Sequence, residues 1–508
     1  MVKGDWNQWR GESHTGVSTD PTALVDQFPA KELPVAWESE SIPSDLEGGH
    51  GSPVVADGRV YLGLVWHTKV ASETRVIDEE VLTSLGYRET SLLGEDLTRQ
   101  LEGVRRTLST RLRGEAQEQW IRQWLQEHFN DEQRLILGSW AGWRMGQRRQ
   151  ALDLDLMAKI HQHVNQPFPS VTAMTAWLRG QGATNEDLEK ILKAVPDTVA
   201  IGKDTVLCLD AGTGKTVWRF EHDGLPTGRA GSSTCAVIGN RVFWPGSKCL
   251  YAMDAKDGLL LWQAGVRSGC GSSPLIEGDK VWLQAATLRC YDAAEGHLLW
   301  ENKEIKGDTS SPILWNTADG ERTLVSQCAG RVVGLNPQDG VLRWEVPGGG
   351  DSTPVPSGED LVIMSSAKDV GLRCYHHEAK KAPEVSWSHW WLAARHSSTP
   401  VVKDGYVYLM EGGKHLCVRV KDGAVAWESA VESTISSPIL VDGKLLCLEE
   451  NGLYLRLLRA TPAKYDPLGR TRVSALWCPT PAPWKGLLVI RRKDRLTCLD
   501  LRATRPVE

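Results

Sequence analysis

Eight residues just ahead of predicted β-strands carry side chains suited to binding a polar ligand. They are three arginines, two histidines, two aspartates and one threonine: His50, Arg229, Arg267, Asp308, Asp351, Arg395, His396 and Thr434. Charged and hydrogen-bonding groups that converge on one concave surface can hold a polar molecule in a fixed orientation. The alternative is that these side chains face solvent and bond only within their own loops.

Three further groupings are candidate metal ligands. His376 and His377 are adjacent, and one residue separates His161 from His163. A zinc-type site needs further cysteine, histidine or carboxylate ligands at suitable spacing, which neither pair has, so we expect these histidines to face solvent. Glu449-Glu450-Asn451 places carboxylate and amide oxygens in one loop, and Ca²⁺ accepts such ligands. The sequence leaves the presence of a metal open.

The motifs of several common enzyme classes are missing from the sequence. It has no G-x-S-x-G nucleophile elbow, Walker A loop, dinucleotide-binding glycine fingerprint or H-E-x-x-H zinc motif. The net charge of −6 gives no reason to expect nucleic acid or an anionic membrane surface as a partner. No run of 18 or more apolar residues occurs, so we expect no membrane span.

A repeated β-hairpin would position the eight candidate residues. One pattern recurs with a glycine four residues before a tryptophan, as LCLDAGTGKTVW to Trp218, AMDAKDGLLLW to Trp262, CYDAAEGHLLW to Trp300, GLNPQDGVLRW to Trp344 and VRVKDGAVAW to Trp427. Glycine supplies the positive φ that a hairpin turn needs, and the neighbouring aspartate or asparagine bonds to its own backbone. The period of about 42 residues is typical of propeller blades or of a solenoid.

Counting the strand openings predicts the architecture. Segments resembling S-S-P followed by alternating apolar residues begin at Gly51, Gly231, Gly271, Ser310, Asp351, His396, Ile435 and Cys478. We therefore predict an all-β fold, an eight-bladed β-propeller of four-stranded blades. The last strand, LTCLDLR, lacks a closing tryptophan, whereas an early strand with Trp37 has no blade before it. We expect these two strands to pair, because a closed ring leaves no exposed sheet edge.

Residues 69–200 interrupt the first blade between its second and third strands. Strand alternation gives way there to helical periodicity, from Leu92 and again from Glu115. Thr184-Asn-Glu-Asp187 has the pattern of a capping box, and Pro196 follows the end of the same helix. We predict a mainly α-helical subdomain that opens on the face of the candidate residues and covers them. The resulting division is a leader, closing strand and first strands of blade 1 in residues 1–68, the insertion in 69–200, and the remaining propeller in 201–508.

Cysteine usage bears on the compartment. The eleven cysteines are odd in number, and Cys208, Cys290, Cys374 and Cys498 recur at one position of a half-buried strand, where cysteine acts as a small hydrophobe. Reduced thiols favour a reducing compartment. The start MVKGDWNQWRG lacks the apolar core of a signal peptide, so we expect a cytoplasmic protein. A periplasmic location applies instead if a leader has been removed.

The aspartate turn, glycine and tryptophan at fixed offsets, together with the S-S-P opening, resemble the tryptophan-docking repeat of pyrroloquinoline-quinone (PQQ)-like propellers. The start DWNQWRG also resembles that of bacterial PQQ-binding-like β-propeller repeat proteins. The resemblance covers about residues 5–66 and 205–502 and excludes the insertion. It implies a structural docking role between blades for Trp37, Trp218, Trp262, Trp300, Trp344, Trp387 and Trp427. Burial of each such side chain contributes about 2–3 kcal/mol.

The resemblance does not fix an activity, because the same repeat occurs in alcohol and sugar dehydrogenases, in a lipoprotein of outer-membrane protein assembly and in sensor domains. A quinoprotein dehydrogenase would, by resemblance, need a Glu/Asn pair on Ca²⁺, an aspartate base and often two adjacent cysteines. This sequence has no adjacent cysteine pair and no stretch that matches the metal and base segments. We therefore predict a monomeric, non-catalytic scaffold that binds a protein or a small polar, sugar-like ligand at the channel mouth. An oxidoreductase that uses PQQ and Ca²⁺ on alcohols or sugars, and a glycan-binding module, are the alternatives.

Overall fold

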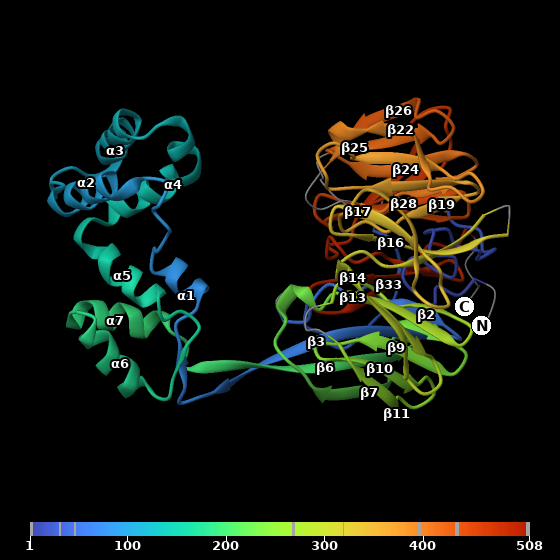
Figure 1. Cartoon of the computed structure of the whole chain (residues 1–508), viewed down its shortest axis with the longest axis horizontal. Helices are drawn as coiled ribbons and strands as arrows, with labels where there is room; N and C mark the ends of the chain where they lie inside the picture. The colour runs from blue at the N-terminus through green and yellow to red at the C-terminus, as the bar shows by residue number, and fades with distance from the viewer. Residues whose placement is uncertain are drawn as a thin grey trace. The chain divides into compact units, whose positions relative to one another are not determined.

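The computed structural model describes residues 4–29, 32–44, 47–266, 270–317, 320–393, 398–431 and 436–503, with only the backbone described at Arg229. Strands dominate one compact unit of the chain, and helices dominate a second compact unit, Lys69–Ala200 (Figure 1). Among the described residues, no helix combines the length and apolar character needed to cross a membrane.

The strand-rich unit is a β-propeller of antiparallel sheets whose strands follow one another in sequence. The first four sheets contain β2 (Val54–Ala56), β3 (Arg59–Ala71), β6 (Thr198–Asp210) and β7 (Thr216–Asp223); β8 (Ala236–Ile238), β9 (Arg241–Pro245), β10 (Cys249–Asp254) and β11 (Leu260–Gly265); β12 (Leu275–Glu277), β13 (Lys280–Asp292) and β14 (Leu298–Gly307); and β15 (Ile313–Asn316), β16 (Arg322–Cys328), β17 (Arg331–Leu335) and β18 (Leu342–Pro347). In the three-stranded sheet, β13 bends at Ala286, whose φ is 66°; its first half pairs with β12 and its second half with β14.

The remaining sheets follow the same order. They contain β19 (Val355–Ser357), β20 (Asp360–Met364), β21 (Leu372–His376) and β22 (Glu384–His389); β23 (Val401–Lys403), β24 (Tyr406–Glu411), β25 (Lys414–Arg419) and β26 (Val425–Ala430); β27 (Ile439–Val441), β28 (Lys444–Glu449), β29 (Tyr454–Arg459) and β30 (Pro467–Arg472); and β31 (Ala482–Trp484), β32 (Leu487–Arg491), β33 (Leu496–Asp500) and β1 (Val35–Glu38). Because β1 pairs with β33, this last sheet joins the two ends of the chain. Two short 3₁₀ helices, η2 (Gly228–Ala230) and η3 (Trp390–Leu392), lie in the connections.

Tryptophan side chains link successive sheets. Six indole N–H groups each donate to a backbone carbonyl in the turn of the next sheet, at 2.5–3.2 Å: Trp37 to Ala211, Trp218 to Ala255, Trp262 to Ala293, Trp300 to Pro337, Trp387 to Val420 and Trp427 to Thr461. Trp344, the remaining repeat tryptophan, packs edge-on against Trp315 with ring centroids 6.2 Å apart. In the six tryptophans with this bond, the apolar ring packs between sheets while its one polar group is hydrogen-bonded.

Small residues make room for these rings. The turn glycine of one sheet lies under the tryptophan of the preceding sheet, so that a Cβ on Gly258, whose φ is 76°, would lie 2.6 Å from the Trp218 ring. On the strand beside each ring, the residue paired with the tryptophan is also small, as in Cys208 opposite Trp218 and Cys417 opposite Trp427. The recurring cysteine is therefore explained by packing against a large ring.

One sheet departs from this rule. Gly469 of β30 occupies the position that tryptophan occupies in the other sheets, since it pairs with Leu457 immediately before the same irregularity in register. Phe28 packs over it, and a Cβ on Gly469 would lie 2.7 Å from the Cβ of Phe28. An aromatic ring from the segment before β1 thus lies beside the position where the repeat has no tryptophan.

The N-terminal segment, residues 4–18, lies against the first strands of three sheets, which in a propeller face the central channel. Trp6 and Val55 of β2 exchange both backbone hydrogen bonds at 2.8 Å, and the carbonyl of Asn7 accepts from the Val237 N–H of β8. Farther along, Gly16 and Ser18 bond to Leu440 of β27. The segment therefore pairs with strand edges that would otherwise have unpaired backbone groups.

The helical unit contains α1 (Glu79–Ser84), α2 (Gly94–Thr107), α3 (Gly114–His128), α4 (Asp131–Gln147), η1 (Arg148–Gln150), α5 (Leu154–His161), α6 (Val171–Gly180), α7 (Asn185–Ala194) and the short pair β4 (Arg75–Val76) and β5 (Pro167–Phe168). Thr184 caps α7 through the reciprocal bonds of a capping box with Asp187. The unit has two apolar clusters, one around Leu101 and Ala141 and the other around Leu82 and Met157. Beside the first cluster, Glu102 forms buried ion pairs with Arg105 and Arg144.

Candidate functional site

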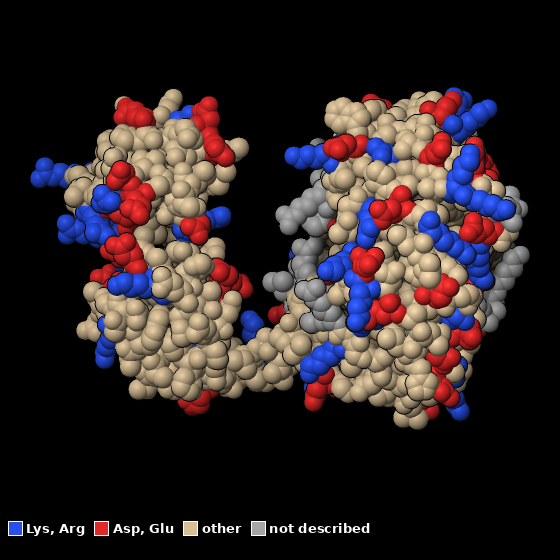
Figure 2. All heavy atoms as spheres, in the orientation of Figure 1, with Lys and Arg blue, Asp and Glu red and all other residues tan. Residues whose placement is uncertain are grey.

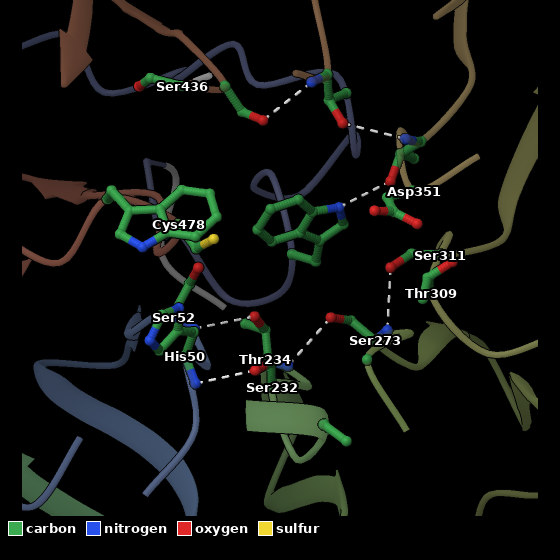
Figure 3. Close-up of a pocket in the computed structure, with 17 residues that line it drawn as sticks. His50, Ser52, Ser232, Thr234, Ser273, Thr309, Ser311, Asp351, Ser436 and Cys478 are labelled. Atoms are coloured by element: carbon green, nitrogen blue, oxygen red, sulfur yellow. Dashed lines mark hydrogen bonds between the residues drawn. The ribbon is translucent and has the colours of Figure 1, made fainter. Parts of the chain in front are cut away.

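The main candidate site is a cavity of about 500 Å³ at the ends where the first strands of the sheets begin. We call it the mouth pocket. Its lining comes from the N-terminal segment and from the loops ahead of successive first strands: Trp9, His50, Ser52, Ala230, Ser232, Thr234, Gly271, Ser273, Thr309, Ser311, Asp351, Thr353, Thr399, Ser436, Ser437, Trp477 and Cys478 (Figure 3). Hydroxyl groups predominate, and they come from segments far apart in sequence.

A chain of hydroxyl groups joins neighbouring sheets around the mouth pocket. In each link the backbone N–H of one sheet donates to a serine or threonine oxygen of the next: Thr480 to Ser52, Ser52 to Thr234, Thr234 to Ser273, Ser273 to Ser311, Thr353 to Thr399 and Thr399 to Ser437. Figure 3 shows the links through Ser52, Thr234, Ser273 and Ser311. The S-S-P opening of the repeat therefore has a structural role, and the same hydroxyls present polar groups to the cavity.

Two indole rings add apolar surface to this polar lining. The N–H of Trp9 donates to Oγ1 of Thr353 at 2.9 Å, which fixes the ring within the mouth pocket. Trp477 lies edge-on to His50, with ring centroids 5.9 Å apart and planes at 88°. The backbone N–H of His50 donates to Oγ of Ser232 at 2.9 Å, so the imidazole extends from a fixed backbone position. A cavity with apolar faces and several placed hydrogen-bonding groups suits a small polar molecule.

Of the eight residues selected from sequence, the structure brings His50 and Asp351 to the mouth pocket. Asp308 is not among the lining residues; its backbone carbonyl accepts from the N–H groups of Gly271 and Ser272 at 2.8 Å, and so it holds a loop. Arg229 lies in η2, and its side chain is outside the described part of the chain. The other four positions, Arg267, Arg395, His396 and Thr434, lie outside the described residues.

The histidine pairs considered as metal ligands make other contacts. His376 pairs with Asp360 through Nδ1 and Oδ1 at 2.8 Å, whereas His377 is buried edge-on to Trp315. The expectation that both face solvent is therefore wrong for His377, because the two side chains point to different sides of the chain. In the helical unit, His161 pairs with Glu79, and His163 stacks on Trp177.

The Glu449-Glu450-Asn451 loop is also engaged within the protein. Glu449 is buried and accepts from Nε2 of His415 at 2.7 Å and Nε of Arg456 at 3.0 Å, while Arg470 pairs with both glutamates. Burial raises the pKa of Glu449, but the hydrogen bonds from His415 and Arg456 outweigh it and hold that pKa below its ordinary value. Its charge is thus already balanced by neighbouring cations.

The residues of the mouth pocket do not fit PQQ with Ca²⁺. Ca²⁺ takes six to eight oxygen ligands, usually with several carboxylates. Among the described lining residues, Asp351 carries the only carboxylate, and within the described parts of the chain no three histidine, cysteine, aspartate or glutamate side chains are grouped to hold a metal ion.

The exposure of the cysteine thiols differs between the core and the mouth pocket. None of the eleven cysteines, all of which lie in the described part of the chain, forms a disulfide, and Cys478 is the exposed one. Burial raises the pKa of the Cys208 and Cys417 thiols to about 11, so these groups stay protonated and unreactive near neutral pH.

Sequence reasoning missed most of the mouth pocket. The hydroxyl chain was visible as the S-S-P openings, but their spacing alone does not reveal which oxygen links sheets and which faces the channel. Trp9 was visible in DWNQWRG, yet only the course of the N-terminal segment brings it beside Thr353. Trp477 and Cys478 belong to the most degenerate repeat, where the pattern gives the least guidance.

The chain matches one family model and is similar to several solved structures. The family model described as outer membrane protein assembly factor BamB matches residues 202–361 and 379–462. No curated protein sequence matches the chain. Solved structures with a similar course include BamB from Moraxella catarrhalis, at 16% identity, with a TM-score of 0.47, 58% of this chain and 88% of that chain covered. The computationally designed Ika8 protein has 14% identity, a TM-score of 0.44, and coverage of 59% and 93%.

A third similar structure is the quinohemoprotein alcohol dehydrogenase ADHIIG from Pseudomonas putida HK5, with 11% identity, a TM-score of 0.44, and coverage of 61% of this chain and 74% of that chain. At these identities and scores the structural likenesses carry no functional argument.

On the face seen in Figure 2, acidic and basic side chains of the strand-rich unit are interspersed without a broad patch of one sign. The family match, the repeated turn and the four-stranded antiparallel sheets together support a PQQ-like repeat β-propeller family for this chain.

Proposed function

We propose that the strand-rich unit is a closed ring of eight blades, docked through the repeat tryptophans, and that its mouth pocket binds a small polar ligand. The chain would then act as a binding scaffold and not as an enzyme. Support for eight blades comes from the bent β13, which supplies both middle positions of its sheet. The observation that carries the functional proposal is the 500 Å³ cavity, whose serine and threonine residues come from loops of successive sheets.

The lining indicates the chemistry of the ligand. Several serine and threonine oxygens already accept a backbone N–H, and each of these hydroxyls retains its own proton to donate. Trp9 and Trp477 offer apolar ring surface, and Asp351 offers a carboxylate as a negatively charged hydrogen-bond acceptor. A compound with a polar edge and an apolar face, such as a sugar, matches this combination.

Calorimetric titration with a panel of mono- and disaccharides tests the proposal. Binding should be lost in Trp477→Ala and Trp9→Ala but retained in Trp390→Ala, which removes a tryptophan that is 60% exposed and outside the mouth pocket. Equal loss in all three variants would contradict binding at this site. Addition of PQQ with Ca²⁺ separates the oxidoreductase alternative, since stoichiometric binding with dye-linked oxidation of alcohols or sugars would favour an enzyme.

We also propose a cytoplasmic location, because the eleven cysteines form no disulfide within the described residues and most of them are buried. Buried thiols used as small hydrophobes are compatible with a reducing compartment. Fractionation of cells that express the natural gene tests this, and recovery from the periplasm would contradict it.

A further inference from the structure

The N-terminal segment lies between two cavities of the strand-rich unit. Trp9 lines the mouth pocket, whereas Gln8, Glu12, Ser13 and His14 line a second cavity of about 340 Å³. We call this second cavity the far pocket. It also includes Glu277, Asn316 and Gly358, which lie at or just beyond the ends of first strands, opposite the ends that surround the mouth pocket.

The segment is folded tightly on itself. Arg10, Gly11, His14 and Gly16 all have positive φ, between 59° and 79°. A Cβ on Gly11 would lie 2.8 Å from the Trp6 ring, and a Cβ on Gly16 would lie 2.2 Å from the Arg10 guanidinium. Close contact of two glycines with two large side chains makes this a compact shape and not an extended strand.

Arg10 anchors the segment to the propeller. Its side chain is fully buried, and it donates to the backbone carbonyls of Pro438 at 3.1 Å, Pro400 at 2.6 Å and Thr15 at 3.2 Å. Pro400 and Pro438 follow Thr399 and Ser437 of the hydroxyl chain, so the guanidinium is fixed just below the mouth pocket. Burial lowers the pKa of Arg10 to about 9, which still leaves the group charged at neutral pH. Loss of this cation would leave buried carbonyls without donors.

We propose that residues 4–18 are a tethered internal ligand of the channel, which seals it between the mouth and far pockets, with Arg10 as the anchor that positions Trp9 as the floor of the mouth pocket. The site is therefore a peptide-binding channel that the chain fills with its own N-terminus. The channel recognises this segment through Arg10, which lies between the aromatic Trp9 and Gly11. The sealing and anchoring stand independently of the ligand, whereas the role of Trp9 as a floor rests on the proposed function.

The test is to cut the tether while leaving the segment in place. A protease site inserted between Asp26 and Gln27, both exposed, gives a fragment that ends at residue 26 and a body that starts at residue 27. After cleavage, the fragment should remain bound through gel filtration and exchange slowly with a fluorescent synthetic peptide of residues 4–26. Arg10→Met should speed this exchange more than tenfold, and Arg10→Lys should give an intermediate rate, because one ammonium group restores the charge but not the fork of donors.

Arg59→Met is the matched control. Arg59 also bridges two backbone carbonyls, those of Ala255 and Lys256, but it does not hydrogen-bond to the N-terminal segment. Its loss should lower the melting temperature without changing fragment exchange. Equal exchange in the wild type and Arg10→Met, or equal acceleration by Arg59→Met, would overturn the proposal.

If the cleaved protein does not stay folded, a second measurement on the uncut chain tests the same proposal. In the uncut chain, amide hydrogen exchange of residues 5–18 should be slow, and Arg10→Met should accelerate it more than tenfold there while leaving β20 unchanged. Acceleration that is uniform across the strand-rich unit would overturn the anchoring role. If a mouth-pocket ligand is found, Arg10→Met should weaken its binding as Trp9→Ala does; a failure of the ligand assay alone leaves the exchange result to decide.

Discussion

The indole N–H of Trp9 donates a 2.9 Å hydrogen bond to Oγ1 of Thr353, a residue 344 positions farther along the chain. This contact places a side chain from the N-terminal segment at the start of β19. It joins the part of the chain synthesised first to the hydroxyl chain around the mouth pocket, where Thr353 donates its own N–H to Thr399. The pocket is thus built by the N-terminal segment and the blades together.

We expect Thr353→Val to destabilise the protein by about 1–3 kcal/mol, because the change leaves a partly buried indole N–H without an acceptor. Urea denaturation of the full chain measures the loss. Ser13→Ala is the control, since the hydroxyl of Ser13 bonds to Thr15 at the surface and should contribute less than about 0.5 kcal/mol. Identical midpoints for the two variants would mean that the Trp9 contact adds no stability.

Gly258→Ala should destabilise the protein by about 2–4 kcal/mol, because it combines a positive φ with a Cβ 2.6 Å from the Trp218 ring. Gly239→Ala separates the two causes. Gly239 also has a positive φ, of 54°, but no atom lies within 4 Å of its added Cβ, so we expect about 1–2 kcal/mol. Calorimetric melting of both variants gives the comparison. Equal losses of unfolding free energy would mean that contact with the ring is not the reason for the constant glycine-to-tryptophan spacing of the repeats.

The stability of the strand-rich unit should depend on the ionisation of Glu411. Burial raises the pKa of Glu411 from 4.5 to about 7, and the carboxyl group accepts N–H bonds from Ser398 and Gly412. The pKa of Glu411 is higher in the folded protein than in the unfolded chain. The stabilisation that protonated Glu411 contributes is therefore fully present below pH 4.5 and is lost as the pH rises through 7.

Glu411→Gln should therefore melt near the wild-type temperature at pH 5 and above it at pH 8.5, by an amount equivalent to at most about 3 kcal/mol. Melting curves across this range, with Glu378→Gln as an exposed control, measure the effect. Parallel pH profiles for the wild type and Glu411→Gln would contradict it.

In the helical unit, Glu102→Gln should cost about 3–5 kcal/mol of local stability, because Arg105 and Arg144 would remain buried without their shared carboxylate. Hydrogen exchange should report opening in α2 and α4 with no change in the strand-rich unit. Glu95→Gln removes an exposed pair with Arg99 at 4.0 Å and should cost less than about 1 kcal/mol. A comparable effect of both variants would rule out burial as the cause.

The sequence predicted the repeated sheets better than the site because the two depend on different ranges of interaction. A turn glycine four residues before a tryptophan is a local pattern, and so is the small residue that pairs with the ring. The mouth pocket instead depends on where loops from distant blades converge. His50 and Asp351 reach it, whereas Asp308, which lies one residue farther ahead of its strand than Asp351 does, contributes a carbonyl to loop structure. Phe28, which packs over Gly469, and Trp9 belong to non-repeating segments whose position no periodicity encodes.

The pairing of β1 with β33 has a consequence for the order of events during synthesis. Trp37 lies beside Cys498, so strand β1 leaves the ribosome more than 450 residues before its partner exists. Arg10 must likewise wait for Pro438. Contacts between residues so far apart in sequence form slowly, because the entropy of closing a long loop is lost before the contact contributes any stabilisation. Arg10 and strand β1 should therefore remain unpaired until translation is almost complete, and the segment that contains them should be open to proteases and chaperones during synthesis.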